Sequence, residues 1–280
     1  MNYRHAYHAA NHADVLKHAV LARLLVHLAK KDKPFRVIDA HAGLGLYSLN
    51  APEAGKTLEW REGVGRLYDD AGAVLPLPSL AEAMLAPWRE VVGQVNGPGP
   101  LETYPGSPEI ARRMMRRMDK LSLNELHPED FITLSRRYGQ DLRVVLTQVD
   151  AGTVLKAQLP PPERRGLILI DPPYEKTDEA QRVGRMLAEG LKRFATGIFA
   201  VWYPVTGDGL DEKLGQIIRA LDLPLLQVEM RVRSVESGGL AGSGLFILNP
   251  PWQLDDELKL LLPALTQRLA QGPGAMGFVR

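Results

Sequence analysis

An acid, two prolines and an aromatic residue stand directly after a short aliphatic run in residues 167–176, whose sequence is LILIDPPYEK. The carboxylate of Asp171 and the carbonyl of Pro172 can accept the two N–H groups of one exocyclic amine. The proline pair fixes φ and removes two backbone donors, so the turn is stiff, and Tyr174 offers a flat face on which a nucleobase can stack. The amine of adenine is a poor nucleophile because its lone pair is delocalised into the ring. The pattern therefore predicts a site that orients such an amine for methyl transfer.

A second segment, LFILNPPW at residues 245–252, has almost the same shape, with Asn249 in place of the acid and Trp252 in place of the tyrosine. A catalytic turn of this kind normally follows the fourth strand of its sheet. Too few residues follow Asn249 for three more strands, whereas three candidate strands follow Asp171. The order of elements thus favours Asp171, and the second segment is expected to be a strand end that leads into the last helix.

A glycine-containing loop follows the first apolar strand in FRVIDAHAGLGLYSL, residues 35–49, which carries Gly43 and Gly45. Glycines at the carboxyl edge of an open α/β sheet let a ligand approach the backbone closely, although they are as common in simple tight turns. The dinucleotide pattern GxGxxG is absent, which weighs against a nicotinamide-dependent oxidoreductase. S-adenosylmethionine (SAM) requires less, namely a glycine loop and an acid after the second strand.

Three consecutive candidate strands end in acids, namely Asp39, Glu125 and Asp150. Because parallel strands end at the same edge of a sheet, these carboxylates are expected to lie together. Glu125 would accept the ribose hydroxyls of SAM, and Asp150 would lie near its adenine ring. Glu125 could instead be a favourable negative charge at the start of the following helix.

Five histidines lie near the start of the chain, at positions 5, 8, 12, 18 and 27. His8 and His12 have the spacing of metal ligands on a helix, but no HExxH motif, cysteine or third carboxylate ligand accompanies them, so we expect no metal. Lys17 and His18, together with a terminal segment that carries Tyr3 and His5, could instead fold over a cofactor.

Composition limits the possible classes of protein. The 280 residues are 45% hydrophobic, as in ordinary globular proteins. There is no cysteine, so disulfides and thiolate chemistry are excluded. The formal net charge of +1 gives no general attraction to nucleic acid, and local pairs such as Arg164 and Arg165 are candidates for an RNA contact. No signal peptide or membrane span is found, so we expect a cytoplasmic protein.

Apolar runs alternate with amphipathic ones, which predicts a doubly wound α/β fold. Seven strands are expected, at 36–39, 121–126, 143–149, 166–171, 197–204, 225–234 and 244–249. Helices are expected at 12–31, capped by Asn11, and at 108–118, 128–138, 178–194, 210–221 and 254–271. No helix separates the last two strands, so they should form an antiparallel hairpin. Residues 51–105 are rich in Pro, Gly and Ala without a convincing strand, and are expected to form an inserted helical subdomain.

The sequence resembles the bacterial 23S rRNA adenine-N6 methyltransferase family, which modifies adenine 2030. The resemblance rests on six segments, YRHAYHAANHADVLKH (3–18), DAHAGLGLY (39–47), YPGSP (104–108), NELHPED (124–130), RRGLILIDPPYE (164–175) and GSGLFILNPPW (242–252). It runs nearly end to end. It implies a Rossmann-like class I SAM-dependent methyltransferase, a single domain over 1–280 with the 51–105 insertion and with residues 1–31 lying over the cofactor and target site.

Site residues follow from the same resemblance, position by position. Asp171 would be the catalytic acceptor with Pro172 and Tyr174, and Tyr3 and His5 would order the target adenine. The cofactor would be bound by His18, His41, Gly43, Ser107, Glu125, Asp150 and Ala151, with Lys17 adjoining them. Ala151 replaces a glycine common in the family, a change that a backbone contact would survive.

The expected partner is 23S rRNA, bound by a monomer that needs no metal and no membrane. Two other functions stay open at this point. A DNA adenine-N6 methyltransferase would share all the chemistry, and a non-enzymatic RNA-binding module would need none of it. The intact DPPY turn beside a cofactor loop favours an enzyme.

Overall fold

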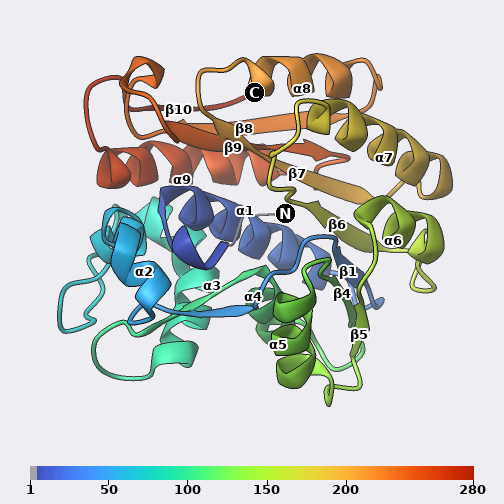
Figure 1. Ribbon diagram of the computed structural model, residues 1–280, viewed down its shortest axis with the longest axis horizontal. Helices are drawn as coiled ribbons and strands as arrows, with labels where there is room; N and C mark the ends of the chain where they lie inside the picture. Colours follow the sequence, from blue (N-terminus) through green and yellow to red (C-terminus); the bar gives the residue numbers. More distant parts are fainter. Residues whose placement is uncertain (1–4) are drawn as a thin grey trace.

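The main element of the computed structural model, which describes residues 5–280, is an eight-stranded sheet (Figure 1). Its strand order is β10-β8-β9-β7-β6-β1-β4-β5. The strands are β1 (Arg36–Asp39), β4 (Lys120–Asn124), β5 (Val144–Thr147), β6 (Gly166–Ile170), β7 (Ile198–Val205), β8 (Leu225–Arg231), β9 (Gly242–Leu248) and β10 (Met276–Val279). Strands β5, β4, β1, β6 and β7 are parallel, and β9 pairs antiparallel with both β7 and β8. The expected Rossmann-like fold with a closing antiparallel hairpin is confirmed.

The predicted count of seven strands is wrong. Strand β10 adds an eighth by pairing antiparallel with β8, and a separate two-stranded sheet joins β2 (Leu46–Ser48) to β3 (Thr103–Pro105). The latter places a strand inside residues 51–105, where none was expected. These strands have only three or four residues, too few for apolar alternation to distinguish them from loops.

Helices cover both faces of the sheet. One face carries α1 (His12–Ala29), α3 (Ser79–Asn96), α4 (Ser107–Met114), α5 (Pro128–Tyr138) and α9 (Leu254–Leu269). The other carries α6 (Ala151–Gln158), α7 (Glu179–Arg193) and α8 (Leu210–Arg219). Short pieces remain at α2 (Pro52–Thr57) and in the 3-10 turns η1 (His5–Tyr7), η2 (Glu59–Glu62), η3 (Val64–Arg66) and η4 (Val235–Ser237). No helix in residues 5–280 is long and apolar enough to cross a bilayer.

The strands divide the core into two layers because their side chains alternate between the faces. In β6, Leu167 and Leu169 pack on the α1 side, whereas Ile168 and Ile170 pack on the α7 side. All five residues of this strand are buried. A strand buried on both faces reads as a continuous apolar run, which explains the aliphatic segment that precedes Asp171.

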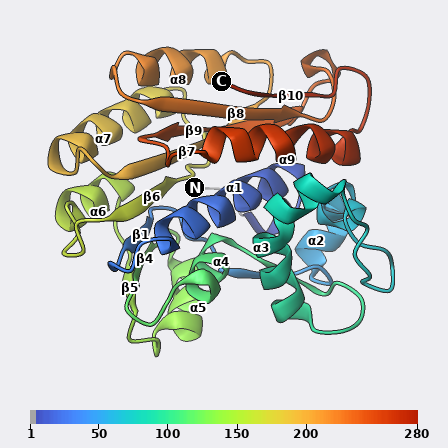
Figure 2. The same ribbon diagram turned by 180° about the vertical axis from the view of Figure 1, so that it is seen from behind.

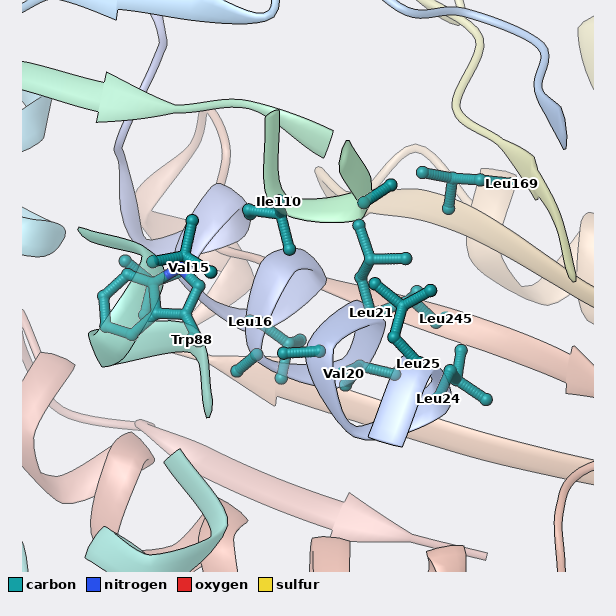
Figure 3. Packing of buried hydrophobic residues seen from close by; sticks show 14 of the residues in the cluster. Val15, Leu16, Val20, Leu21, Leu24, Leu25, Trp88, Ile110, Leu169 and Leu245 are labelled. Carbon is teal, nitrogen blue, oxygen red and sulfur yellow. The ribbon is translucent and has the colours of Figure 1, made fainter. Parts of the chain in front are cut away.

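Helix α1 runs through the centre of the molecule, between α9 on one side and α3 and α4 on the other (Figures 1 and 2). Asn11 caps it, as predicted, by accepting hydrogen bonds from the amides of Ala13 and Asp14. A helix that is apolar nearly all round belongs in a core. Figure 3 shows its Leu and Val side chains between Trp88 and Ile110 on one side and Leu169 and Leu245 of the sheet on the other. Each fully buried Leu stabilises the fold by about 1.5–3 kcal/mol, so the polar residues of α1 are firmly positioned.

Candidate active site

A cavity of about 970 Å³ lies at the carboxyl edge of the parallel strands, where open α/β folds bind ligands. This volume is at the upper end of the range for one drug-sized ligand. Its walls include all the described residues that the sequence assigned to the site, namely His5, Lys17, His18, His41, Gly43, Ser107, Glu125, Asp150, Ala151, Asp171, Pro172 and Tyr174. Tyr3 lies outside the described residues.

Asp171, the first residue after β6, is held from two sides. Its backbone amide donates to His41 Nδ1 at 3.2 Å, and its Oδ2 accepts a hydrogen bond from Lys17 Nζ at 2.6 Å. Burial lowers the pKa of His41 to about 4, so the ring is neutral and its Nδ1 can accept. No hydrogen bond from residues 5–280 to Oδ1 of Asp171 was found, which leaves that oxygen for a ligand.

Lys17 joins Asp171 to a second buried carboxylate, Asp14. Lys17 Nζ lies 2.9 Å from Asp14 Oδ1, while Asp14 Oδ2 accepts from the amide of Ala10 at 2.8 Å and pairs with His5 Nε2 at 2.9 Å. Burial opposes the charge on Lys17, but Asp14 and Asp171 outweigh it and hold the pKa of Lys17 well above 10.5. Lys17 is therefore a fixed cation that bridges the carboxylates of Asp14 and Asp171.

The aromatic residue of the turn, Tyr174, is also fixed. Its φ is 51°, in the left-handed region that a bulky residue rarely adopts, and its hydroxyl donates to the carbonyl of Trp202 at 2.7 Å. The two rings are tilted with centroids 6.2 Å apart, and Lys17 Nζ lies 5.8 Å from the Trp202 ring. Trp202 thus lies between Tyr174, which packs against it, and the ammonium group of Lys17.

The glycine loop after β1 is tied to the acid at the end of β4. Glu125 accepts from the amide of Gly43 at 2.8 Å and from that of His127 at 2.8 Å. Burial raises the pKa of Glu125 above 4.5, although both amides oppose the shift. Gly43 has φ +60°, and a Cβ built there would lie 2.3 Å from the hydroxyl of Tyr47. Only glycine fits this position without strain.

The other two strand-end acids have different surroundings. Asp39 is buried, with Oδ2 accepting from Ser107 Oγ at 2.7 Å and Oδ1 accepting from the amide of His41 at 3.2 Å. Burial raises its pKa to about 6. Asp150 is exposed and caps α6, whose first residue is Ala151, and its Oδ2 lies 3.3 Å from Nη2 of Arg182.

Four of the five N-terminal histidines, namely His5, His8, His12 and His18, line the cavity. His18 Nδ1 lies 2.8 Å from the hydroxyl of Tyr104, and burial lowers the pKa of His18 to about 3, so the ring is neutral. His5 packs edge-on against Tyr47 with ring centroids 5.2 Å apart. His8 and His12 have different neighbours. His8 Nδ1 pairs with Glu59 at 2.9 Å, and among residues 5–280 no group of three potential ligands comes together.

The residues present fit SAM. Gly43 lines the cavity without a side chain of its own, and the carboxylates of Glu125 and Asp150 follow the neighbouring strands β4 and β5. Carboxylate oxygens accept from hydroxyl and amino groups, which SAM carries on its ribose and adenine. The cavity extends from these acids to Asp171, so a cofactor and a target base have adjoining places.

Sequence reasoning missed three residues of the site. Asp14 was not considered, although its spacing to Lys17 places both on one helix face. Asp39 was noted only as a strand end, and Trp202 gave no signal because it lies inside an apolar strand.

The proposed arginine pair lies elsewhere. Residues 164 and 165 precede β6 and so lie at the opposite edge of the sheet from Asp171, roughly 17 Å away for a strand of this length. Arg165 donates to the carbonyl of Leu28 in the last turn of α1 and to the carbonyl of Lys33, which follows the helix. Its position indicates a structural role at the end of that helix. Asn249 lies at the same far edge, where it donates to the carbonyls of Ala195 and Gly197.

The family model described as "Ribosomal RNA large subunit methyltransferase D, RlmJ" matches residues 32–279. The chain belongs to this family. It is 43% identical to the Escherichia coli "Ribosomal RNA large subunit methyltransferase J" over 96% of this chain and 94% of that protein. It is 40% identical to the Haemophilus influenzae protein of the same name, over 98% and 96% of the two chains. A crystal structure of a Legionella pneumophila protein superposes with a TM-score of 0.88 at 35% identity, covering 98% of both chains.

Proposed function

We propose that this chain, a SAM-dependent methyltransferase of large-subunit ribosomal RNA, transfers the methyl group of SAM to N6 of an adenine in 23S rRNA. The proposed adenine is the family target at position 2030. The observation that carries the proposal is the state of Asp171. One carboxylate oxygen is held by Lys17 at 2.6 Å, and the residue lines a cavity that also contains the glycine loop and the strand-end acids.

Asp171 and Pro172 would hold the amine during transfer. Oδ1 of Asp171 accepts one N–H and the carbonyl of Pro172 accepts the other, which turns the nitrogen lone pair toward the cofactor. Bound SAM supplies an electrophilic methyl group on its sulfonium. The hydrogen bond from Lys17 to Oδ2 fixes the carboxylate of Asp171, which would serve as a hydrogen-bond acceptor for the amine. Because Lys17 holds its own proton tightly, Lys17 is no proton acceptor for the amine.

The other site residues would divide between cofactor and base. Gly43, Glu125, Asp150 and Ala151 would hold SAM, with His18, His41 and Ser107 fixing the loops around it. Tyr174 would stack on the adenine, a contact worth about 1–3 kcal/mol in nucleic-acid complexes. Tyr3 and His5 would close over the base once it has left its stack.

The organisation of the chain follows from these roles. We assign residues 1–280 to one methyltransferase domain in which 51–105 is an insertion and 1–31 covers the cofactor and target site. The enzyme acts in the cytoplasm as a monomer on free or partly assembled 23S rRNA, and requires no metal.

The test is transfer of labelled methyl from SAM to protein-free 23S rRNA, followed by digestion to nucleosides, with wild type beside Asp171→Asn. Asparagine would direct an N–H donor or a single oxygen at the amine and would leave Lys17 with one carboxylate partner. We expect N6-methyladenosine from wild type and a rate at least 100-fold lower from the variant, with SAM still bound.

Two outcomes would redirect the assignment. Methylation of duplex DNA in preference to rRNA, in a competition between the two, would make the chain a DNA adenine-N6 methyltransferase. RNA binding without turnover of any substrate would make it a binding module.

A further inference from the structure

The cavity continues beyond Asp171 along the same edge of the sheet. Its far part is lined by His12, Thr206, Arg233, Gly239 and Gln271. Strand β8 runs parallel to β6, since each antiparallel pairing through β9 reverses direction, so Arg233 after β8 lies at the same edge as Asp171 after β6. Three strand positions separate them, about 14 Å at the usual strand spacing. At that distance from Asp171, Arg233 lies too far away to contact the target base but close enough to contact a neighbouring nucleotide of the RNA strand.

Arg233 is held in one orientation from its own side. Nη1 donates to Gln271 Oε1 at 2.6 Å, and Nη2 donates to the carbonyl of Gly238 at 3.3 Å. Gln271 is fixed in turn, because its backbone amide donates to the carbonyl of Val232 at 2.7 Å. Both acceptors are neutral, so they orient the guanidinium without cancelling its charge.

The charge of Arg233 has no carboxylate partner among residues 5–280. The other arginine of the cavity, Arg182, pairs with Asp150 at 3.3 Å and with Glu179 at 3.7 Å. Across the cavity, Glu59 pairs with His8 and accepts a hydrogen bond from the side-chain Nδ2 of Asn11 at 3.0 Å. An oriented cation that the protein does not neutralise is suited to an anion from outside.

The neighbouring wall is also compatible with an anion. His12 is only 5% exposed, and its Nε2 has no hydrogen-bond partner in the described part of the chain. Burial and the charge of Arg233 lower the pKa of His12 to about 4, so the ring adds no second positive charge at neutral pH. The loop beside Arg233 turns through Gly238 and Gly239, both at positive φ, and so presents backbone without side chains that would block access.

We propose that Arg233 binds an RNA phosphodiester that flanks the target adenine, and thereby sets how the strand enters the site. This inference rests on the proposed function. Arginine suits the role because its planar fork matches phosphate oxygens, and a phosphate contact fixes the register of a strand without reading its sequence. Arg233 is a substrate-binding residue, separate from the groups that orient the amine.

The experiment compares wild type with Arg233→Gln and Arg233→Lys in methyl transfer to protein-free 23S rRNA at several salt concentrations. Arg193→Gln is the matched control, because Arg193 is exposed at the end of α7 away from the cavity. We expect Arg233→Gln to raise KM for RNA about 10- to 100-fold, the effect of losing one hydrogen bond to a charged group, with kcat nearly unchanged. The slope of log KM against log salt should fall by about one.

The remaining results distinguish the possible failures. Arg233→Lys should keep the salt slope and lose part of the affinity. SAM affinity and thermal midpoint should match wild type in every variant, and a fall in either for Arg233→Gln would make its role structural. If Arg233→Gln has the KM and salt slope of wild type, or if Arg193→Gln changes them equally, the inference about Arg233 is overturned. Methyl transfer by wild type in the same experiment would still uphold the proposed function. No transfer to rRNA by wild type, with SAM bound, overturns both.

Discussion

Asp14 is the residue whose removal tests the architecture of the site most directly. Its two oxygens serve Lys17, His5 and the amide of Ala10, and the residue is 1% exposed. Burial raises the pKa of Asp14, but the charges of His5 and Lys17 outweigh burial and hold it well below 3.8. Asp14 is thus an anion in the core, at the junction of the N-terminal segment and the catalytic turn.

Asp14→Asn keeps the shape and removes the charge. If the amide oxygen accepts from Ala10, the amide nitrogen faces Lys17 Nζ, donor against donor. Removing one member of a buried ion pair costs about 3–5 kcal/mol, so we expect the free energy of unfolding to fall by about that amount. Lys17 would then rely on Asp171 alone, and kcat for methyl transfer should fall at least tenfold while SAM affinity changes little.

Urea unfolding and steady-state kinetics measure the two effects. Asp69→Asn is a suitable control, because Asp69 accepts backbone amides in an exposed turn and should change stability by less than 1 kcal/mol. In a double-mutant cycle, Asp14→Leu with Lys17→Met should be less destabilised than the sum of the single changes. Additive losses, or an Asp14→Asn variant with wild-type stability and kcat, would refute the idea that this charge chain positions Asp171.

Two further predictions concern the cofactor loop. Gly43→Ala should weaken SAM binding about tenfold, since a left-handed backbone costs a residue with a Cβ roughly 1–2 kcal/mol and the added methyl would collide with Tyr47. Calorimetry would measure the SAM affinity. Gly55→Ala is the control, because a Cβ at Gly55 meets nothing within 4 Å, and this variant should keep wild-type affinity. Asp39 has a pKa raised to about 6 from 3.8, so the folded state binds more protons than the unfolded state between these values, and stability falls as pH rises. As pH rises from 4 to 7, the free energy of unfolding of Asp39→Asn should therefore increase by up to about 3 kcal/mol relative to that of wild type. A difference between the two proteins that stays constant with pH in urea unfolding would contradict this prediction.

The long elements of the fold could be predicted because their patterns are long. Helix α1 begins at its expected residue, and the buried run of β6 leads into Asp171 as its apolar sequence indicated. Helix α6 was not predicted, since eight residues beginning Ala-Gly give little periodicity. Strand β10 was missed because its four residues follow a glycine-rich turn and pair with a strand far back in the chain.

The candidate site likewise contains residues that could be predicted from the sequence and residues that could not. Residues at strand ends could be grouped from sequence, because parallel strands share an edge. The bond between Lys17 and Asp171 joins positions 154 apart, and no local pattern carries that information. No sequence motif marks Arg233, and its role is indicated only by its neighbours in space. Charge in a sequence shows which side chains could bind, whereas burial and partners decide which charge is left for a ligand.

The central place of α1 has a consequence for how the enzyme is made. Arg23 and His27 both bind Glu257 of α9, at 2.9 Å and across 234 and 230 residues. During synthesis the helix that carries Lys17 therefore emerges early but cannot reach its final surroundings until α9 has been translated. A nascent or truncated chain that lacks α9 would expose the apolar side of α1, which makes it a target for chaperones and proteases. Activity thus begins only after α9 has been translated, so no chain that lacks α9 should methylate RNA.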